Sequence, residues 1–102
     1  MTEYVVDGSG IRSKRAMYAA LAGALSFPDW FGHNLDGLYD CLTDLSWLPK
    51  GAHTVIWSHP EVLAAADPAG YRAIREVLDD AVDGATDPDR TLTVVLGDGS
   101  TG

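Results

Sequence analysis

The chain has 102 residues, 15 acidic and seven basic, and a formal net charge of −8. A chain of this length builds one domain with a single modest core, and its negative charge disfavours binding to nucleic acid or to an anionic membrane. Its single cysteine excludes an intramolecular disulfide framework, and no apolar run approaches the roughly 18 residues of a membrane-spanning segment.

The first 45 residues predict a strand followed by two helices. The β-branched run "EYVV" predicts a strand at 3–6. Ser13 is a typical N-cap residue, and apolar residues at helical spacing predict a helix over 13–25. Pro28 disfavours helical geometry in the residue before it, so "FPDWFG" separates this helix from the next. Asn34 is expected to cap a second helix that runs to about Leu45.

The remainder of the chain predicts two more strands and two more helices. The run "HTVIW" predicts a buried strand at 53–57, and Ser58 is expected to cap a short helix after it. A longer helix is predicted at 68–84, then a polar loop "ATDPDR", a strand at 91–96 and a flexible tail at 97–102. The residues of the longer helix expected to face inward are Tyr71, Ile74, Leu78 and Ala81.

The predicted order of elements is β-α-α-β-α-α-β. Helical connections between consecutive strands are typical of parallel sheets, because parallel strands need long crossovers. The sequence therefore predicts a single α/β domain at 1–96, with a three-stranded parallel sheet packed with helices.

The charge distribution points to the second predicted helix. No Lys or Arg occurs between Arg15 and Lys50, whereas four aspartates do. On a helix, Asp36, Tyr39, Asp40 and Thr43 form one ridge, opposite a leucine face. Aromatic rings that fill pockets and carboxylates that accept bonds from Arg are typical of interfaces, so we expect this ridge to bind a cationic partner.

Simpler explanations exist for several of these residues. The helix dipole favours an acidic residue such as Asp36 in the first turn, with no function required. Asp40 lies beyond that turn, and its repulsion by Asp36 has no structural benefit. Of Trp30 and Phe31, we expect one to pack inward and the other to be exposed. Cys41 borders the leucine face and is expected to be a small core residue, although an exposed edge there could also support self-association.

Catalysis has little support in the sequence. His33, His53 and His59 lack metal-ligand spacing, and no phosphate-binding glycine loop or nucleophile motif is present. We expect His33 to be a loop residue near the interface. Asp36 and Asp40 could in principle bind Mg²⁺ in a phosphate-processing enzyme. The sequence favours a protein that is not an enzyme, without metal or cofactor.

The run "FPDWFGHNLDGLYDCLTDL" resembles the hallmark of the barstar family: an aromatic pair, Gly, then x-Asn-Leu-Asp-x-Leu-aromatic-Asp-Cys-Leu. The likeness extends to "GSGIRS", to a strand ending in Trp57, to "REV" in the late helix and to "TLTVVL". The resemblance implies a three-stranded parallel sheet packed with helices, which agrees with the order derived above.

The resemblance also implies a function. Members of this family block a secreted guanyl-specific ribonuclease inside the cell that makes it, by plugging a cationic active site. It implies that Asp40 is the main mimic of an RNA phosphate and Asp36 a second acidic contact. The late helix is expected to supply one more contact, from Glu76 or instead from Asp79 or Asp80. The implied partner-binding residues are Trp30, Phe31, Gly32, His33, Asn34, Asp36, Gly37, Tyr39, Asp40, Thr43, Asp44 and Glu76.

The resulting expectation is a cytoplasmic inhibitor that binds one small ribonuclease, one-to-one, and no nucleic acid or membrane. The absence of a secretory signal in "MTEYVVDGSG" and the single cysteine are consistent with that compartment. An alternative is an acidic interaction module of the same fold that neutralises a different basic toxin or partner.

Overall fold

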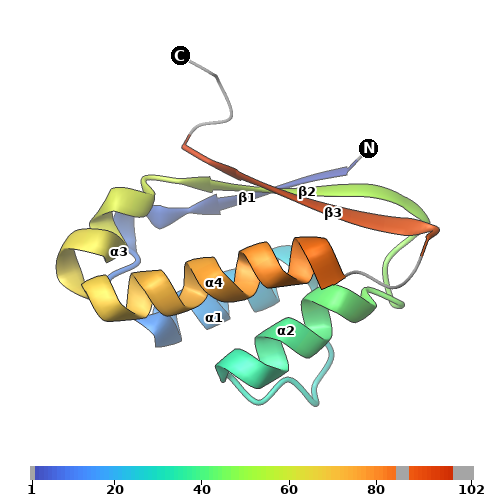
Figure 1. Cartoon of the computed structure of the whole chain (residues 1–102), viewed down its shortest axis with the longest axis horizontal. Helices are drawn as coiled ribbons and strands as arrows, with labels where there is room; N and C mark the ends of the chain where they lie inside the picture. Colours follow the sequence, from blue (N-terminus) through green and yellow to red (C-terminus); the bar gives the residue numbers. More distant parts are fainter. Residues whose placement is uncertain (1, 85–87, 98–102) are drawn as a thin grey trace.

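The computed structural model describes residues 2–84 and 88–97, which form an α/β fold (Figure 1). The predicted tail at 98–102 and residues 85–87 of the predicted polar loop lie outside this range. Gly97, assigned to the tail by the sequence, still donates a backbone hydrogen bond to the carbonyl of Trp57 at 2.8 Å. The elements are β1 (Thr2–Asp7), a 3₁₀ turn η1 (Gly8–Gly10), α1 (Lys14–Leu25), α2 (Leu35–Asp44), β2 (Gly51–Ser58), α3 (Pro60–Ala66), α4 (Pro68–Gly84) and β3 (Arg90–Leu96).

The three strands form one parallel sheet in the order β1-β2-β3, which confirms the predicted fold class. Right-handed crossovers between strands in sequence order place both helical connections on the same face. Figure 1 shows this arrangement: α1 and α4 lie beneath the sheet, and α2 lies below α4, farthest from the strands. The surface of α2 is therefore the side of the molecule opposite the sheet.

None of the helices that the structure describes lies on the other face of the sheet (Figure 1). Successive residues of a strand point to opposite faces, so Val6 is buried while Val5 is 65% exposed. Val5, Ile56 and Val95 stand in register and form one apolar row across this face.

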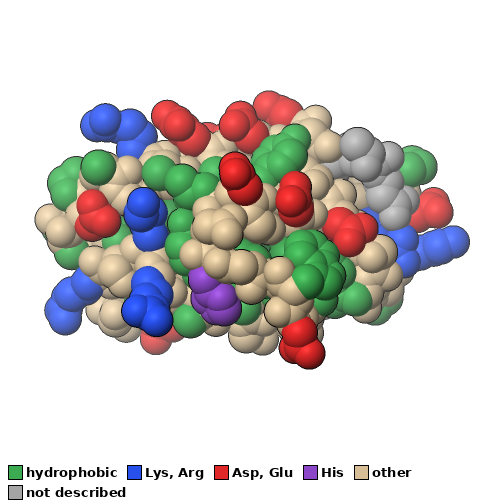
Figure 2. Space-filling model, turned by 90° about the horizontal axis from the view of Figure 1, so that it is seen from below, with side chains coloured by type: hydrophobic (Ala, Val, Ile, Leu, Met, Phe, Trp, Pro, Cys, Tyr) green, Lys and Arg blue, Asp and Glu red, His purple; other side chains and the backbone are tan. Residues whose placement is uncertain are grey.

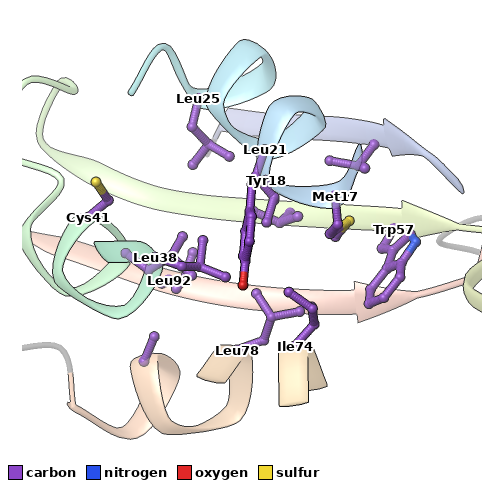
Figure 3. Close-up of a cluster of buried hydrophobic side chains, with 14 of the residues drawn as sticks. Met17, Tyr18, Leu21, Leu25, Leu38, Cys41, Trp57, Ile74, Leu78 and Leu92 are labelled. Atoms are coloured by element: carbon purple, nitrogen blue, oxygen red, sulfur yellow. The ribbon is translucent and has the colours of Figure 1, made fainter. Parts of the chain in front are cut away.

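The core lies between the sheet and the helices (Figure 3). Trp57 is fully buried, as predicted, and its ring lies 5.6 Å from that of Tyr71. Of the four residues expected to face inward on α4, Ile74, Leu78 and Ala81 are buried, and Tyr71 is half-buried. Completely buried residues on all sides of this core include Met17, Leu21, Leu25, Leu38, Leu42, Val55, Leu63, Ile74 and Leu78.

The prediction that Ser58 caps the short helix is wrong. Helix α3 begins at Pro60, and its N-cap is His59, in the left-handed region with φ 50° and no side-chain cap hydrogen bond. Proline at the first helical position has no N–H to satisfy and its fixed φ suits a helix, so the start needs no serine. The Ser58 hydroxyl instead donates to the carbonyl of Val6 at 3.3 Å and accepts from the N–H of Gly8 at 3.4 Å, which joins the ends of β1 and β2.

His53 is a structural residue. Its side chain is buried, with Nε2 2.7 Å from the carbonyl oxygen of Pro49 and Nδ1 2.9 Å from the Tyr4 hydroxyl. A carbonyl can only accept, so Nε2 carries the proton and Nδ1 accepts from Tyr4. The imidazole therefore connects β1, β2 and the loop before β2.

Cys41 is completely buried against the core, as expected for a small core residue, and it presents no exposed edge for self-association. Burial raises the pKa of the Cys41 thiol to about 11, with smaller contributions from Asp40 and Asp44. We expect the native protein to resist thiol reagents at pH 8 and the urea-unfolded protein to react at once, as colorimetric thiol titration would measure.

The raised pKa of the Cys41 thiol predicts a loss of stability at alkaline pH. The folded state holds this proton more tightly than the unfolded state, so its stabilising effect is complete below pH 9 and declines as pH rises towards about 11. Urea denaturation at several pH values should show a steeper decline between pH 9 and 11 for the native sequence than for Cys41→Ala. Parallel declines would contradict the assignment.

Candidate functional site

The loop between α1 and α2 is anchored by Phe31. Its ring is 94% buried and packs edge-on against Phe27 at 4.9 Å and Tyr18 at 6.1 Å between ring centroids. Phe27 packs in turn against Trp47, whose indole N–H donates to the carbonyl of Leu25 at the end of α1, at 2.9 Å. Aromatic contacts of this kind hold a loop in one conformation.

Trp30 is the outward partner of the pair and is 57% exposed. The expectation that one of these two aromatics packs inward is therefore confirmed. Phe31 also appears among the contact residues implied by the family resemblance. Its side chain is buried and supports the site from within, so a direct contact of Phe31 with a partner stays a prediction, while Trp30 presents a large ring to solvent.

The first turn of α2 is closed onto the loop by Asn34. Its side-chain oxygen accepts from the N–H of Gly37 at 2.6 Å, and its amide nitrogen donates to the carbonyl of Gly32 at 3.2 Å. The predicted N-cap is thus confirmed, and both ends of the amide are engaged. A Cβ at Gly37 would lie 3.1 Å from the Asn34 oxygen and 3.3 Å from the Phe31 ring, so a side chain there would press on both the cap and the anchoring ring.

His33 is an exposed loop residue held in a strained backbone conformation, with φ 52°. Its ring lies nearly parallel to that of Phe31, at 4.8 Å between centroids. The imidazole therefore lies against the anchored ring of Phe31.

The predicted ridge on α2 is exposed. Asp36, Tyr39 and Asp40 are accessible, and Thr43 beside them is half-buried. Neither aspartate forms an ion pair among the described residues. The Thr43 hydroxyl donates to the carbonyl of Tyr39 at 2.8 Å, so its proton is already used within the helix. The ridge thus offers unpaired carboxylate acceptors on both sides of an aromatic ring.

Tyr39 also connects α2 to α4. The tyrosine hydroxyl and ring edge lie directly over Gly84, the last residue of α4, where a Cβ would collide with them. Glu76 and Asp80 occupy the same row of α4 as Gly84, at intervals of four residues, and both are exposed. Acidic rows on two helices therefore meet at Tyr39.

The structure distinguishes the three acidic candidates on α4. Asp79 pairs with Arg75 at 3.4 Å. Glu76 and Asp80 form no ion pair among the described residues. The row that leads to Tyr39 therefore carries the two carboxylates without a basic partner.

Gly84 was missed by sequence reasoning, which took it only as the residue that ends the helix. We expect Gly84→Ala to leave stability unchanged or lower it, because the methyl group meets Tyr39. In the Tyr39→Ala background the same change should raise the free energy of unfolding by up to ~1 kcal/mol, since alanine favours helix. A double-mutant cycle by urea denaturation should give a coupling of about 1 kcal/mol, and additive effects would contradict the contact.

The surface around α2 and α4 is acidic as a whole. Figure 2 views this side and shows acidic side chains gathered around hydrophobic ones over the centre, with basic side chains towards the ends. Asp44, at the last position of α2, is exposed and accepts a hydrogen bond from Ser46 at 3.2 Å. The arrangement suits the binding of a cationic protein surface, because multiple carboxylates surround aromatic rings.

Two other kinds of site are absent from residues 2–84 and 88–97. No group of three or more His, Cys, Asp or Glu side chains is placed to hold a metal ion there. No helix in the same ranges combines the length and apolar character that crossing a bilayer requires.

Comparison with known proteins identifies relatives of this chain. The family model described as Barstar (barnase inhibitor) matches residues 1–97. A protein of Bacillus subtilis strain 168, named "Putative ribonuclease inhibitor YrdF", is 39% identical over 49 residues, or 48% of this chain. The matched stretch spans 54% of that relative, about half of its length.

Proposed function

The chain belongs to the barstar family, and from this premise we propose that it inhibits a small guanyl-specific ribonuclease by occluding the enzyme's active site. One observation carries the proposal. The family motif coincides with an exposed surface on which Asp36 and Asp40 flank Tyr39 and form no ion pair with any described residue. The curated relative carries the name of a ribonuclease inhibitor, which supports the same function.

The mechanism follows from the chemistry of the enzyme's cleft. A ribonuclease binds phosphates with Arg, Lys and His, and these groups accept carboxylates in the same positions. Asp40 would occupy the principal phosphate position and Asp36 a second. The unpaired row of Glu76 and Asp80 would extend the contact onto α4. No bond is made or broken: inhibition is reversible exclusion of RNA by one inhibitor molecule.

The aromatic rings supply the remaining affinity. Trp30 directly precedes the buried Phe31 in the loop, and the Tyr39 ring lies against Gly84 of α4, so the backbone position of one ring and the packing of the other precede binding. Preorganised aromatic side chains lose little conformational entropy when they enter a pocket. His33, Asn34 and the glycines of the loop would line the rim of this contact.

Electrostatics should also accelerate association. Asp36 and Asp40 repel each other in the free protein, and a cationic partner relieves that repulsion. Opposite charges steer encounter, so we expect an association rate constant of about 10⁸ M⁻¹s⁻¹ at low salt that falls as salt increases.

An inhibition assay tests the proposal directly. RNA cleavage by a panel of small guanyl-specific ribonucleases, including barnase, should be blocked by micromolar inhibitor or less. Isothermal titration calorimetry with the inhibited enzyme should give a stoichiometry of one. If every ribonuclease remains active, and a different basic toxin is captured instead, the alternative of an interaction module for that toxin replaces this proposal.

A further inference from the structure

An open groove of about 550 Å³ lies between the N-terminal ends of α1 and α2. Its two walls carry opposite charge character. The α1 wall is basic, whereas the α2 wall includes the acidic end of the ridge. The residues that matter here are Lys14, Arg15 and Tyr18 on the first wall and His33, Asn34 and Asp36 on the second.

The fold does not account for the positive charges of the two basic residues. Lys14 and Arg15 are the first two residues of α1, where the helix dipole disfavours positive charge, and no acidic residue occupies that turn. Neither forms an ion pair among the described residues, and neither closes across the groove onto Asp36. A protein of net charge −8 thus places two unpaired cations beside its acidic surface.

The groove is continuous with the surface assigned to the ribonuclease. His33, Asn34 and Asp36 line the groove and also belong to the proposed contact surface. An enzyme that contacts Asp36 therefore borders the same groove that Arg15 lines. If the enzyme surface there were as cationic as the cleft that faces Asp40, like charges would repel and weaken the complex.

We infer that an acidic side chain on the rim of the ribonuclease cleft enters this groove and pairs with Arg15, with Lys14 as a second cation. The inference rests on the proposed function and refines it, because it specifies the partner's charge pattern: a cationic centre with an acidic residue at one edge. Ribonucleases that carry a basic residue at that edge would be rejected, so the groove selects among enzymes with similar active sites.

Arg15→Gln is the decisive variant because the groove contact and long-range electrostatics predict opposite changes in affinity for the enzyme. The change makes the formal net charge −9 in place of −8, which by long-range attraction should tighten binding to a cationic enzyme. The groove contact predicts the reverse, weaker binding with a Kd that rises by about tenfold or more. Arg15 is preferred over Lys14, whose half-buried stem lies against Gly70 at the start of α4.

Lys50→Gln is the control for net charge, since it removes the same charge at an exposed position that pairs with Asp89 at 3.5 Å and does not line the groove. Kd would be measured by competition against the ribonuclease that the native inhibitor blocks, at 50 and 200 mM salt, and thermal melting would verify folding. Arg15→Gln should melt no lower than the native protein, because it removes an unfavourable charge from the start of a helix.

The outcomes separate the inference from the proposed function. Weaker binding by Arg15→Gln, with Lys50→Gln equal to or tighter than native, supports the groove contact. Unchanged or tighter binding by Arg15→Gln, or equal weakening by both variants, overturns it while native inhibition still upholds the proposed function. If the native protein inhibits no ribonuclease, the proposed function itself fails.

Discussion

Replacing Asp40 by Ala is expected to weaken inhibition by about 2–5 kcal/mol, or roughly 30-fold to several thousandfold in Kd. The carboxylate is exposed and forms no ion pair within residues 2–84 and 88–97, so its loss costs the free protein little. In the complex it would face buried cations of the enzyme, and truncation would leave those cations desolvated and unpaired. Most of the cost arises from that stranded charge.

Asp44→Ala is the matched control for Asp40→Ala. It removes an identical side chain one turn later, at the C-terminal end of α2, where the Asp44 carboxylate accepts a hydrogen bond from the Ser46 hydroxyl. Its effect on Kd should be within about tenfold. The free protein should become slightly more stable in Asp40→Ala, by a few tenths of a kcal/mol, since repulsion from Asp36 is relieved. Equal losses of inhibition for the two variants would remove the ridge from the mechanism.

The neighbouring residues Trp30 and Phe31 should give opposite results when each is replaced by Ala. Phe31→Ala deletes a ring that is 6% exposed and packs against three other aromatic rings, so we expect a loss of ~3 kcal/mol or more in the free energy of unfolding. Trp30→Ala deletes a ring that is 57% exposed, so stability should change by at most about 0.5 kcal/mol. Its Kd should rise by about 30-fold or more, as for an aromatic residue central to an interface.

Urea denaturation and inhibition assays on both variants test this contrast. Phe31→Leu provides the control for folding, because it retains an apolar side chain and should restore most of the stability. If Trp30→Ala destabilises the protein as much as Phe31→Ala does, Trp30 is a structural residue. If it leaves both quantities unchanged, the exposed ring has no part in binding.

Much of the fold could be predicted because local signals and the global topology agree. Asn34 lies at the start of an amphipathic segment, and its side chain caps α2. Helical connections between three apolar runs indicated a parallel sheet, which is what the structure contains. Ser58 misled the prediction because a serine before a helix has two possible uses. Its hydroxyl serves the β1–β2 junction, a contact between residues about 50 positions apart that no local pattern reveals.

The sequence predicted which residues make up the candidate site but not the contacts that hold them in place. The ridge followed from helical spacing alone. The choice of Phe31 as the inward ring depended on Tyr18 and Phe27, which lie on other segments. The contact of Tyr39 with Gly84 requires the relative placement of two helices, which is a property of packing that no local pattern encodes. The pairing of Asp79 with Arg75 is different, because it joins residues four apart on α4 and the sequence spacing alone could have indicated it.

The uncovered face of the sheet offers a site for a spectroscopic reporter. Val5 is exposed on that face, away from the helices that carry the acidic ridge, and the chain's single cysteine is completely buried. In Val5→Cys the introduced thiol would be the reactive one, so a fluorophore could be attached there without first removing Cys41. Titration with an enzyme would then be followed optically from the back of the molecule, with the contact surface left chemically intact.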